Sequence, residues 1–140
     1  MCIKEKKPFL LNTNDSNAAF AAIKAAAQSN EYTVISIDCK KANAEDFGGV
    51  PYVDKNKKAG VATPQWAEHI IKNKNKKFIV FFDSVCQLDA DALNALMPIV
   101  LDNTVTDVDL GKNTIICASC GDINKLSKPL LSKLKPVIKL

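Results

Sequence analysis

The stretch PFLLNTNDSNAAFAAIKAAA, residues 8–27, joins a short apolar run to an alanine-rich segment through a polar turn. The apolar run predicts a strand over residues 8–12. Asp15 or Ser16 can cap the helix that follows, which we expect to extend to about Ser29. Because alanine side chains are small, this helix can pack closely on a sheet, so the stretch predicts a strand covered by its own helix. The turn between them contains no glycine.

The rest of the chain continues this alternation. Runs rich in β-branched and apolar residues predict further buried strands at residues 32–39, 78–85, 114–119 and 136–140. Helical patterns predict further helices at residues 64–74, 89–102 and 128–134. Residues 40–63 are expected to form a loop-rich excursion that can include a hairpin. This order predicts an α/β fold, a three-layer αβα sandwich with a mainly parallel five-stranded sheet.

The helical patterns also predict which side chains face inward. Trp66 is expected to anchor the helix of residues 64–74 in the core. The helix of residues 89–102 has one apolar stripe, formed by Leu93, Leu96, Met97, Val100 and Leu101. Residues 104–113 alternate between apolar and polar types, which predicts an exposed hairpin.

Composition limits the class of protein. The chain has 140 residues, 47% of them hydrophobic and 24% charged, which suits one domain over residues 1–140. The apolar runs are too short for a membrane span, and the N-terminus does not resemble a signal peptide. We therefore expect an intracellular protein, either cytoplasmic or, if it is viral, part of a virion.

The charge pattern disfavours nucleic acid as a partner. The net charge is +4, and all 19 basic residues are lysine. Arginine, which makes the commonest specific contacts to bases, is absent, and the few aromatic residues fall mostly inside apolar runs. We expect the lysine clusters to be solvated surface.

The cysteines are Cys2, Cys39, Cys86, Cys117 and Cys120. An odd number without a signal peptide predicts reduced thiols. Cys117 and Cys120 have the C-x-x-C spacing of redox and zinc sites. Cys117 falls inside a predicted strand rather than at a helix start, and no second pair follows at zinc-site spacing. We expect both to be buried structural thiols, and we expect neither a metal nor another cofactor.

Six stretches occur in a recognisable order. They are EDFGGVPYVD (45–54), TPQWAEHI (63–70), FIVFFDSV (78–85), DADALNALMPIVLDN (89–103), NTIICASCGD (113–122) and LSKPLLSKL (126–134). This series resembles the core subdomain of the MoxR-type AAA+ ATPases, a branch of the P-loop NTPases. In that family the corresponding pieces are a Gly-Gly-x-Pro loop, a helix, the Walker B strand, a second helix, the sensor-1 strand and an arginine-finger helix. The resemblance covers about residues 8–140 and implies the P-loop NTPase fold without the helical lid domain.

The resemblance places the opening stretch at the phosphate-binding loop. In the motif G-x-x-x-x-G-K-[ST], glycines let backbone N–H groups reach phosphate, lysine contacts the terminal phosphates and the hydroxyl binds magnesium. Here Thr13 and Ala18 take the glycine positions, Ala19 the lysine position and Phe20 the Ser/Thr position. All four defining positions differ from the motif, and Phe20 cannot bind magnesium.

The other functional positions that the resemblance implies have changed too. Asp83 matches the Walker B aspartate, but Ser84 follows it where the family has the glutamate that polarises the attacking water. Cys120 falls at the sensor-1 position, where a polar residue is expected. Lys133 falls at the arginine-finger position, and a finger contributes roughly 10³–10⁵ to the rate in classes where it has been measured. We therefore expect no ATPase activity and no catalytic residues.

Two classes of function remain open. The first is a catalytically inactive AAA+-like protein that serves as a structural or interaction module. Its partners would be proteins, in an oligomer or a larger assembly such as a phage or virus particle or a remodelling complex. The second is an enzyme or ligand-binding protein, including a nucleotide-binding one, that reuses the crevice at the carboxyl edge of the sheet. Its candidate groups are Asp83, Ser84, Cys120 and Asp122.

Overall fold

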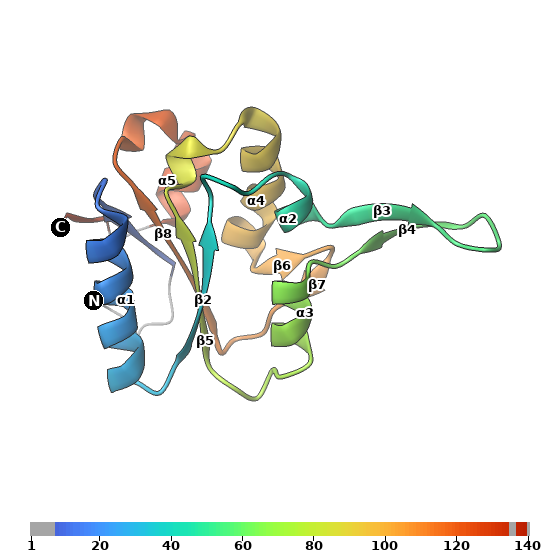
Figure 1. Cartoon of the computed structure of the whole chain (residues 1–140), viewed down its shortest axis with the longest axis horizontal. Coiled ribbons are helices and arrows are strands. Elements are labelled where there is room, and N and C mark those ends of the chain that lie inside the picture. The colour runs from blue at the N-terminus through green and yellow to red at the C-terminus, as the bar shows by residue number, and fades with distance from the viewer. Residues whose placement is uncertain (1–7, 135–136, 140) are drawn as a thin grey trace.

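The computed structural model describes residues 8–134 and 137–139, and it is organised around one five-stranded sheet (Figure 1). The strands of this sheet are β1 (Phe9–Asn12), β2 (Thr33–Asp38), β5 (Phe78–Asp83), β8 (Thr114–Cys120) and β9 (Val137–Lys139). They lie in the order β2-β5-β8-β1-β9, and every neighbouring pair is parallel. The predicted α/β fold with a mainly parallel five-stranded sheet is confirmed.

Helices cover both faces of this sheet. One face carries α1 (Ser16–Ser29), whose Ala19, Ile23 and Ala27 are buried against β1, β5 and β8. The other face carries α3 (Gln65–Ile71), α4 (Ala90–Asp102) and α5 (Lys128–Lys133). None of the helices between residues 8 and 134 has the length and apolar character that crossing a membrane requires.

Two of the sequence-based strand predictions need correction. The strand predicted as buried at residues 32–39 is β2, which lies at the sheet edge and is half exposed, because only β5 pairs with it. The strand predicted to reach Val85 ends at Asp83, where the left-handed backbone of Ser84 (φ 61°) turns the chain into a short 3-10 helix. The predicted strand at residues 136–140 is β9, and Pro136 and Leu140 lie outside the described residues.

The apolar stripe of α4 is wider than predicted. Leu96 and Val100 are buried as expected, and Leu93 and Met97 are half buried and pack against the same core, whereas Leu101 is half buried. Ala92 and Ile99 are buried as well. The stripe is wider than a single surface needs because α4 contacts α2 (Glu45–Gly48) and α5 as well as the sheet.

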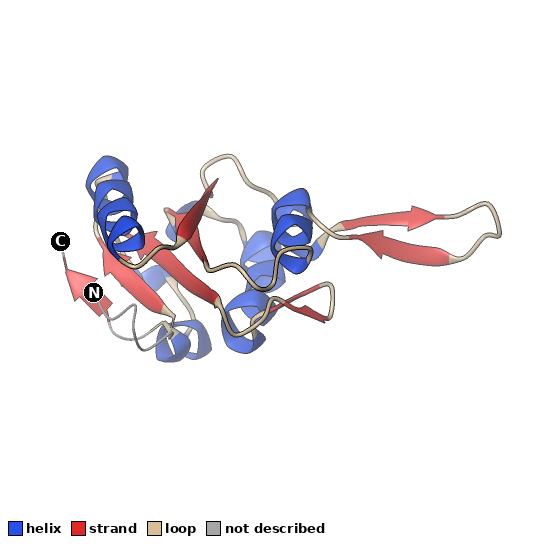
Figure 2. Cartoon of the chain, turned by 90° about the horizontal axis from the view of Figure 1, so that it is seen from below, coloured by secondary structure: helices blue, strands red, loops and turns tan. Residues whose placement is uncertain are grey.

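The excursion at residues 40–63 contains more structure than expected. After α2 the chain forms a hairpin from β3 (Val50–Val53) and β4 (Ala59–Ala62), and Figure 2 shows it projecting from the body of the molecule. Gly49 (φ 84°) makes the turn into this hairpin, and a Cβ there would clash with the Ala62 carbonyl oxygen and Val61. The predicted hairpin after α4 is also present, as β6 (Thr104–Val105) and β7 (Val108–Asp109).

Trp66 anchors α3 at the margin of the core rather than inside it. The Trp66 and Phe82 rings pack edge to face, with their centroids 5.8 Å apart. The Phe47 ring also packs on the Phe82 ring, with a centroid distance of 5.6 Å. Trp66 is half buried, and its indole N–H donates a hydrogen bond to the Asp46 carbonyl oxygen at 2.7 Å. Phe82, on β5, is therefore the contact that joins both α2 and α3 to the sheet.

Truncating Phe82 should be one of the most damaging core changes. We expect Phe82→Ala to lower the free energy of unfolding by about 3–5 kcal/mol, because it removes a fully buried ring and leaves a cavity. Val53→Ala, at a side chain that is 68% exposed, should change it by less than about 0.5 kcal/mol. Urea denaturation followed by circular dichroism measures both, and equal effects would contradict this assignment of the core.

Candidate functional site

The candidate site lies at the carboxyl edge of the sheet, between β1 and β8. These strands are neighbours, but their crossovers leave in opposite directions, since α1 leads to β2 at one side of the sheet and α5 leads to β9 at the other. A crevice is expected where the strand order reverses in this way, and ligands of α/β sheets bind there. The structure brings Thr13, Asp83, Ser84 and Cys120 to this edge.

The N-terminus of α1 is occupied by a carboxylate of the chain itself. Only Thr13, Asn14 and Asp15 connect β1 to α1. Asp15 Oδ1 accepts a hydrogen bond from the Ala18 N–H at 3.0 Å, and the Asp15 N–H donates to Thr13 Oγ1 at 3.0 Å. In a phosphate-binding loop such helix N-terminal N–H groups bind phosphate. Here the side chain of Asp15 supplies the negative charge instead.

The remaining phosphate-loop positions lie in the first turns of α1. Ala19 is fully buried against the sheet, so its Cβ points into the core rather than toward the crevice. Phe20 is 39% exposed. A lysine side chain at position 19 would therefore start in the buried cluster under α1, and leaving its ammonium group buried there without a partner would be costly. The assignment of these positions as degenerate remains a prediction.

The connection also packs against the end of β8. The Thr13 N–H donates to the Cys120 carbonyl oxygen at 3.1 Å, which ties the loop to the end of β8. Asn14 lies so close to Gly121 that a Cβ at residue 121 would clash with the Asn14 amide. A larger residue at position 121 would therefore have to displace the Asn14 side chain. The sequence-based analysis did not identify Asn14 or Gly121.

A small hydrogen-bonded network adjoins the crevice on the α1 side. The Ser119 hydroxyl donates to Asp83 Oδ1 at 2.8 Å and accepts from the Ser84 N–H at 2.8 Å. The Ser84 hydroxyl lies 3.3 Å from Asp83 Oδ1 and 3.5 Å from the Ser16 hydroxyl. These contacts hold Ser84 in its left-handed conformation, which costs a non-glycine residue about 1–2 kcal/mol. They also give Asp83 Oδ1 two hydroxyl donors.

Ser119, which sequence reasoning missed, is the β8 residue that contacts Asp83. Cys120, at the expected sensor-1 position, belongs to the cluster on the other face of the sheet. The signal that could have distinguished them is the alternation of side chains along a strand, which places Ser119 and Cys117 on the α1 face and Cys120 on the opposite face.

The same alternation separates the C-x-x-C pair. Cys117 packs under α1, whereas Cys120 packs with the helices on the other face. Both thiols are buried, as predicted. Instead, Cys120 lies beside Cys86, and burial together with the hydrogen bond to Cys86 raises the pKa of the Cys120 thiol to about 12. Partial burial opposes ionisation of Cys86 too, but hydrogen bonds from the Gly121 backbone and Cys120 outweigh it and lower the pKa of Cys86.

Two carboxylates lie close to each other at this edge. Asp38 and Asp83 are register partners at the ends of β2 and β5. Within residues 8–134 and 137–139, no three His, Cys, Asp or Glu side chains converge as metal ligands would.

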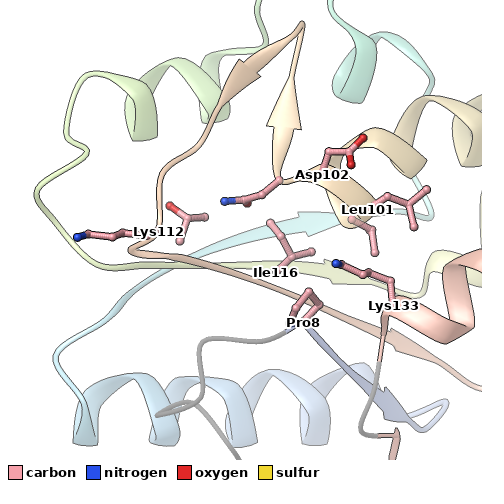
Figure 3. Close-up of a pocket in the computed structure, with 9 residues that line it drawn as sticks. Pro8, Leu101, Asp102, Lys112, Ile116 and Lys133 are labelled. Atoms are coloured by element: carbon pink, nitrogen blue, oxygen red, sulfur yellow. The ribbon is translucent and has the colours of Figure 1, made fainter.

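Lys133 lies away from the other predicted positions. It lines a cavity of about 400 Å³ beside Pro8 and Ile116, which lie just before β1 and near the start of β8 (Figure 3). Lys112 and Asp102 line the same cavity. Since parallel strands begin at one edge and end at the other, this cavity is at the amino edge of the sheet, opposite the crevice. Within one chain, Lys133 therefore cannot act on a ligand at the carboxyl edge.

Solved structures with the same fold are P-loop ATPases of the AAA+ type. A candidate ATPase from Cytophaga hutchinsonii matches 96% of this chain with a TM-score of 0.64 and 14% identity. The RuvB Holliday junction branch migration motor of Thermotoga maritima matches 96% with a TM-score of 0.57 and 14% identity. NtrX from Brucella abortus matches 96% with a TM-score of 0.61 and 9% identity. The α/β fold of this chain thus matches the fold of these ATPase structures.

The likeness is confined to that fold. The chain spans 42%, 37% and 33% of the length of these three proteins. No protein-family model matches the sequence, and no curated protein matches it significantly.

Removing the Ser119 hydroxyl should disturb this edge measurably. We expect Ser119→Ala to lower the free energy of unfolding by about 1–3 kcal/mol, because Asp83 and the Ser84 N–H both lose a partner. The matched control is Ser36→Ala on the exposed side of β2, which should change it by less than about 0.5 kcal/mol. Urea denaturation of the two variants makes the comparison, and a smaller effect at residue 119 than at residue 36 would refute the network.

The thiols should differ in reactivity. Thiolate is the nucleophilic form, so Cys86, with its lowered pKa, should react with iodoacetamide faster than Cys39, Cys117 and Cys120. Burial raises the pKa of Cys39 and of Cys117. The rate of Cys86 alkylation should rise with pH and should level off at a lower pH than the alkylation rate of a free cysteine does. Peptide mass spectrometry over a pH series tests this, with urea-unfolded protein as the control. Equal rates at Cys86 and Cys117 in the folded state would contradict it.

Proposed function

We propose that this chain is a degenerate, MoxR-like AAA+ core that does not hydrolyse ATP and acts as a protein–protein interaction module in an oligomer or larger assembly. The observation that carries the proposal is the carboxylate of Asp15 on the Ala18 N–H, at the helix N-terminus where a P-loop ATPase binds phosphate. A phosphate placed there would meet a fixed negative charge and would have to displace a cap.

The packing of this connection supports the proposal. Asn14 packs on Gly121, and the Thr13 N–H is bonded to the Cys120 carbonyl, so a ligand that entered between the ends of β1 and β8 would have to displace the Asn14 side chain. Asp83 Oδ1 accepts hydrogen bonds from the Ser119 and Ser84 hydroxyls. Ser84 has no carboxylate with which to polarise an attacking water. Each residue that remains here has a structural partner within the chain.

The surface supports an interaction role. Six of the large apolar side chains exposed among the described residues belong to hairpins or to an edge strand: Val50, Tyr52, Val53, Val61, Val108 and Val137. Clusters of exposed apolar residues mark contact surfaces in soluble proteins. A protein that binds through such surfaces needs the rigid AAA+ core but not its chemistry.

Nucleotide should leave the protein unchanged. We expect ATP and ADP at millimolar concentration, with or without Mg²⁺, to leave the Tm unaltered, and we expect no phosphate release above a protein-free control. A ligand at a hundred times its Kd would stabilise the folded state by about 2.7 kcal/mol and raise the Tm by several degrees. A saturable rise in Tm with either nucleotide, or turnover of ATP, would overturn the proposal.

A further inference from the structure

The hairpin of β3 and β4, which we call the arm, has no charged residue in either of its strands. Its strand sequences are VPYV and AGVA, and neither contains a charged side chain. Tyr52 and Val61 are each 51% exposed, and Val53 is 68% exposed. Figures 1 and 2 show the arm extending away from the sheet and helices. A lone two-stranded hairpin is marginally stable in water, so an additional strand would stabilise it.

The hydrogen bonds of the arm determine which backbone groups point outward. The Asp54 N–H donates to the Lys58 carbonyl at 3.0 Å, so this pair is a hydrogen-bonded one. Such pairs alternate along an antiparallel ladder. Tyr52 with Gly60 and Val50 with Ala62 are therefore also hydrogen-bonded pairs. The pairs between them are Pro51 with Val61 and Val53 with Ala59. The backbone N–H and C=O groups of these residues, where present, point away from the partner strand.

The two outer edges of the arm differ. On β3 the outward positions are Pro51 and Val53, and proline has no N–H to donate. On β4 they are Ala59 and Val61, both with intact donors and acceptors. Nothing in the described part of the chain pairs with this edge of β4. Soluble proteins usually protect such an edge with lysine, proline or a bulge, and none of these lies within Ala59–Ala62.

Charge is separated along the arm. The tip, Asp54–Lys58, carries three lysines against one aspartate. Near its base, β4 adjoins the β6–β7 hairpin, because the Thr63 hydroxyl lies 2.8 Å from that of Thr106. A cavity of about 510 Å³ there is lined by Val61, Thr63 and Val108, and also by Asp107, whose carboxylate is exposed. The tip is therefore basic, and the base beside β4 is acidic.

We propose that two copies of this chain associate through the outer edges of β4, antiparallel about a two-fold axis at Gly60, to form a four-stranded sheet from two arms. Ala59 of each copy then exchanges backbone hydrogen bonds with Val61 of the other. In this register Lys58 lies opposite Ala62 of the second copy and Lys57 opposite Thr63, next to Asp107. The inference rests on the proposed function, since it names the partner and surface of that interaction module.

Self-pairing fits the arm better than other occupants. In an antiparallel pair the basic tip of each copy lies against the acidic base of the other. The same surface therefore carries both of the charges that attract each other across the two-fold axis. A lipid bilayer would have to receive the three tip lysines first, which is costly in hydrocarbon. Nucleic acid would match the lysines but would leave the apolar strands against a charged backbone.

Light scattering after size exclusion, over a dilution series, tests the pairing. We expect the wild type to form a dimer of twice the 15.2 kDa chain mass. Val61→Pro removes an outward N–H of β4, and Val53→Pro removes the equivalent group on the β3 edge, which the dimer leaves unused. Val61→Pro should raise the dimer Kd more than about tenfold relative to Val53→Pro. Val61→Lys and Val53→Lys, which keep every backbone N–H, repeat the comparison, and circular dichroism checks folding.

A charge exchange tests the register. Lys57→Glu with Lys58→Glu in one protein, and Asp107→Lys in another, should each weaken self-association, and mixing the two should restore a heterodimer. Added salt should weaken the wild-type dimer. Three results would overturn the inference. The wild type could be monomeric at every concentration, a Val61 variant could dimerise as tightly as its Val53 counterpart, or the equimolar mixture of the two charge variants could stay monomeric. These are measurements of mass, so they can fail while the nucleotide result still supports the proposed function.

Discussion

The parallel pairing of β5 with β8 is the contact on which the rest of the structure depends. All seven residues of β8 are buried, as are five of the six in β5, because helices cover both faces of these strands. Their pairing carries Asp83 and Ser119 to the same edge of the sheet, and Phe82 secures α2 and α3. The arm begins between those two helices, so its direction also depends on this buried pair.

The carboxyl edge between β1 and β8 is held by contacts within the chain. Two features of one short connection occupy it: the Asp15 carboxylate caps α1, and Asn14 packs on Gly121. Ser119 then binds Asp83, and the strained backbone of Ser84 is held by the same hydroxyl. The side chains at this edge satisfy one another, while the exposed apolar surface lies on the arm.

Much of the fold could be predicted because its signals are local. The apolar run of β5, the Asp89 cap of α4 and the alanine-rich face of α1 each occur within one short stretch of sequence. The β2 strand was misjudged because TVISID is apolar enough for a buried strand, and only the strand order shows that it lies at an edge. The predicted burial of Cys117 and Cys120 is confirmed, and strand alternation places the two thiols on opposite faces of the sheet.

The sequence by itself determined the order of the main strands and helices, the caps, and the absence of glycine from the connection between β1 and α1, because each depends on residues within a few positions of one another. Tertiary structure alone decided that Cys86 lies beside Cys120, that Ser119 contacts Asp83, and that Lys133 lies at the opposite edge from Ser84. It also decided that one edge of the arm is blocked by Pro51 and the other is open at Val61. These relations depend on register and strand order, which arise from packing between segments distant in the chain.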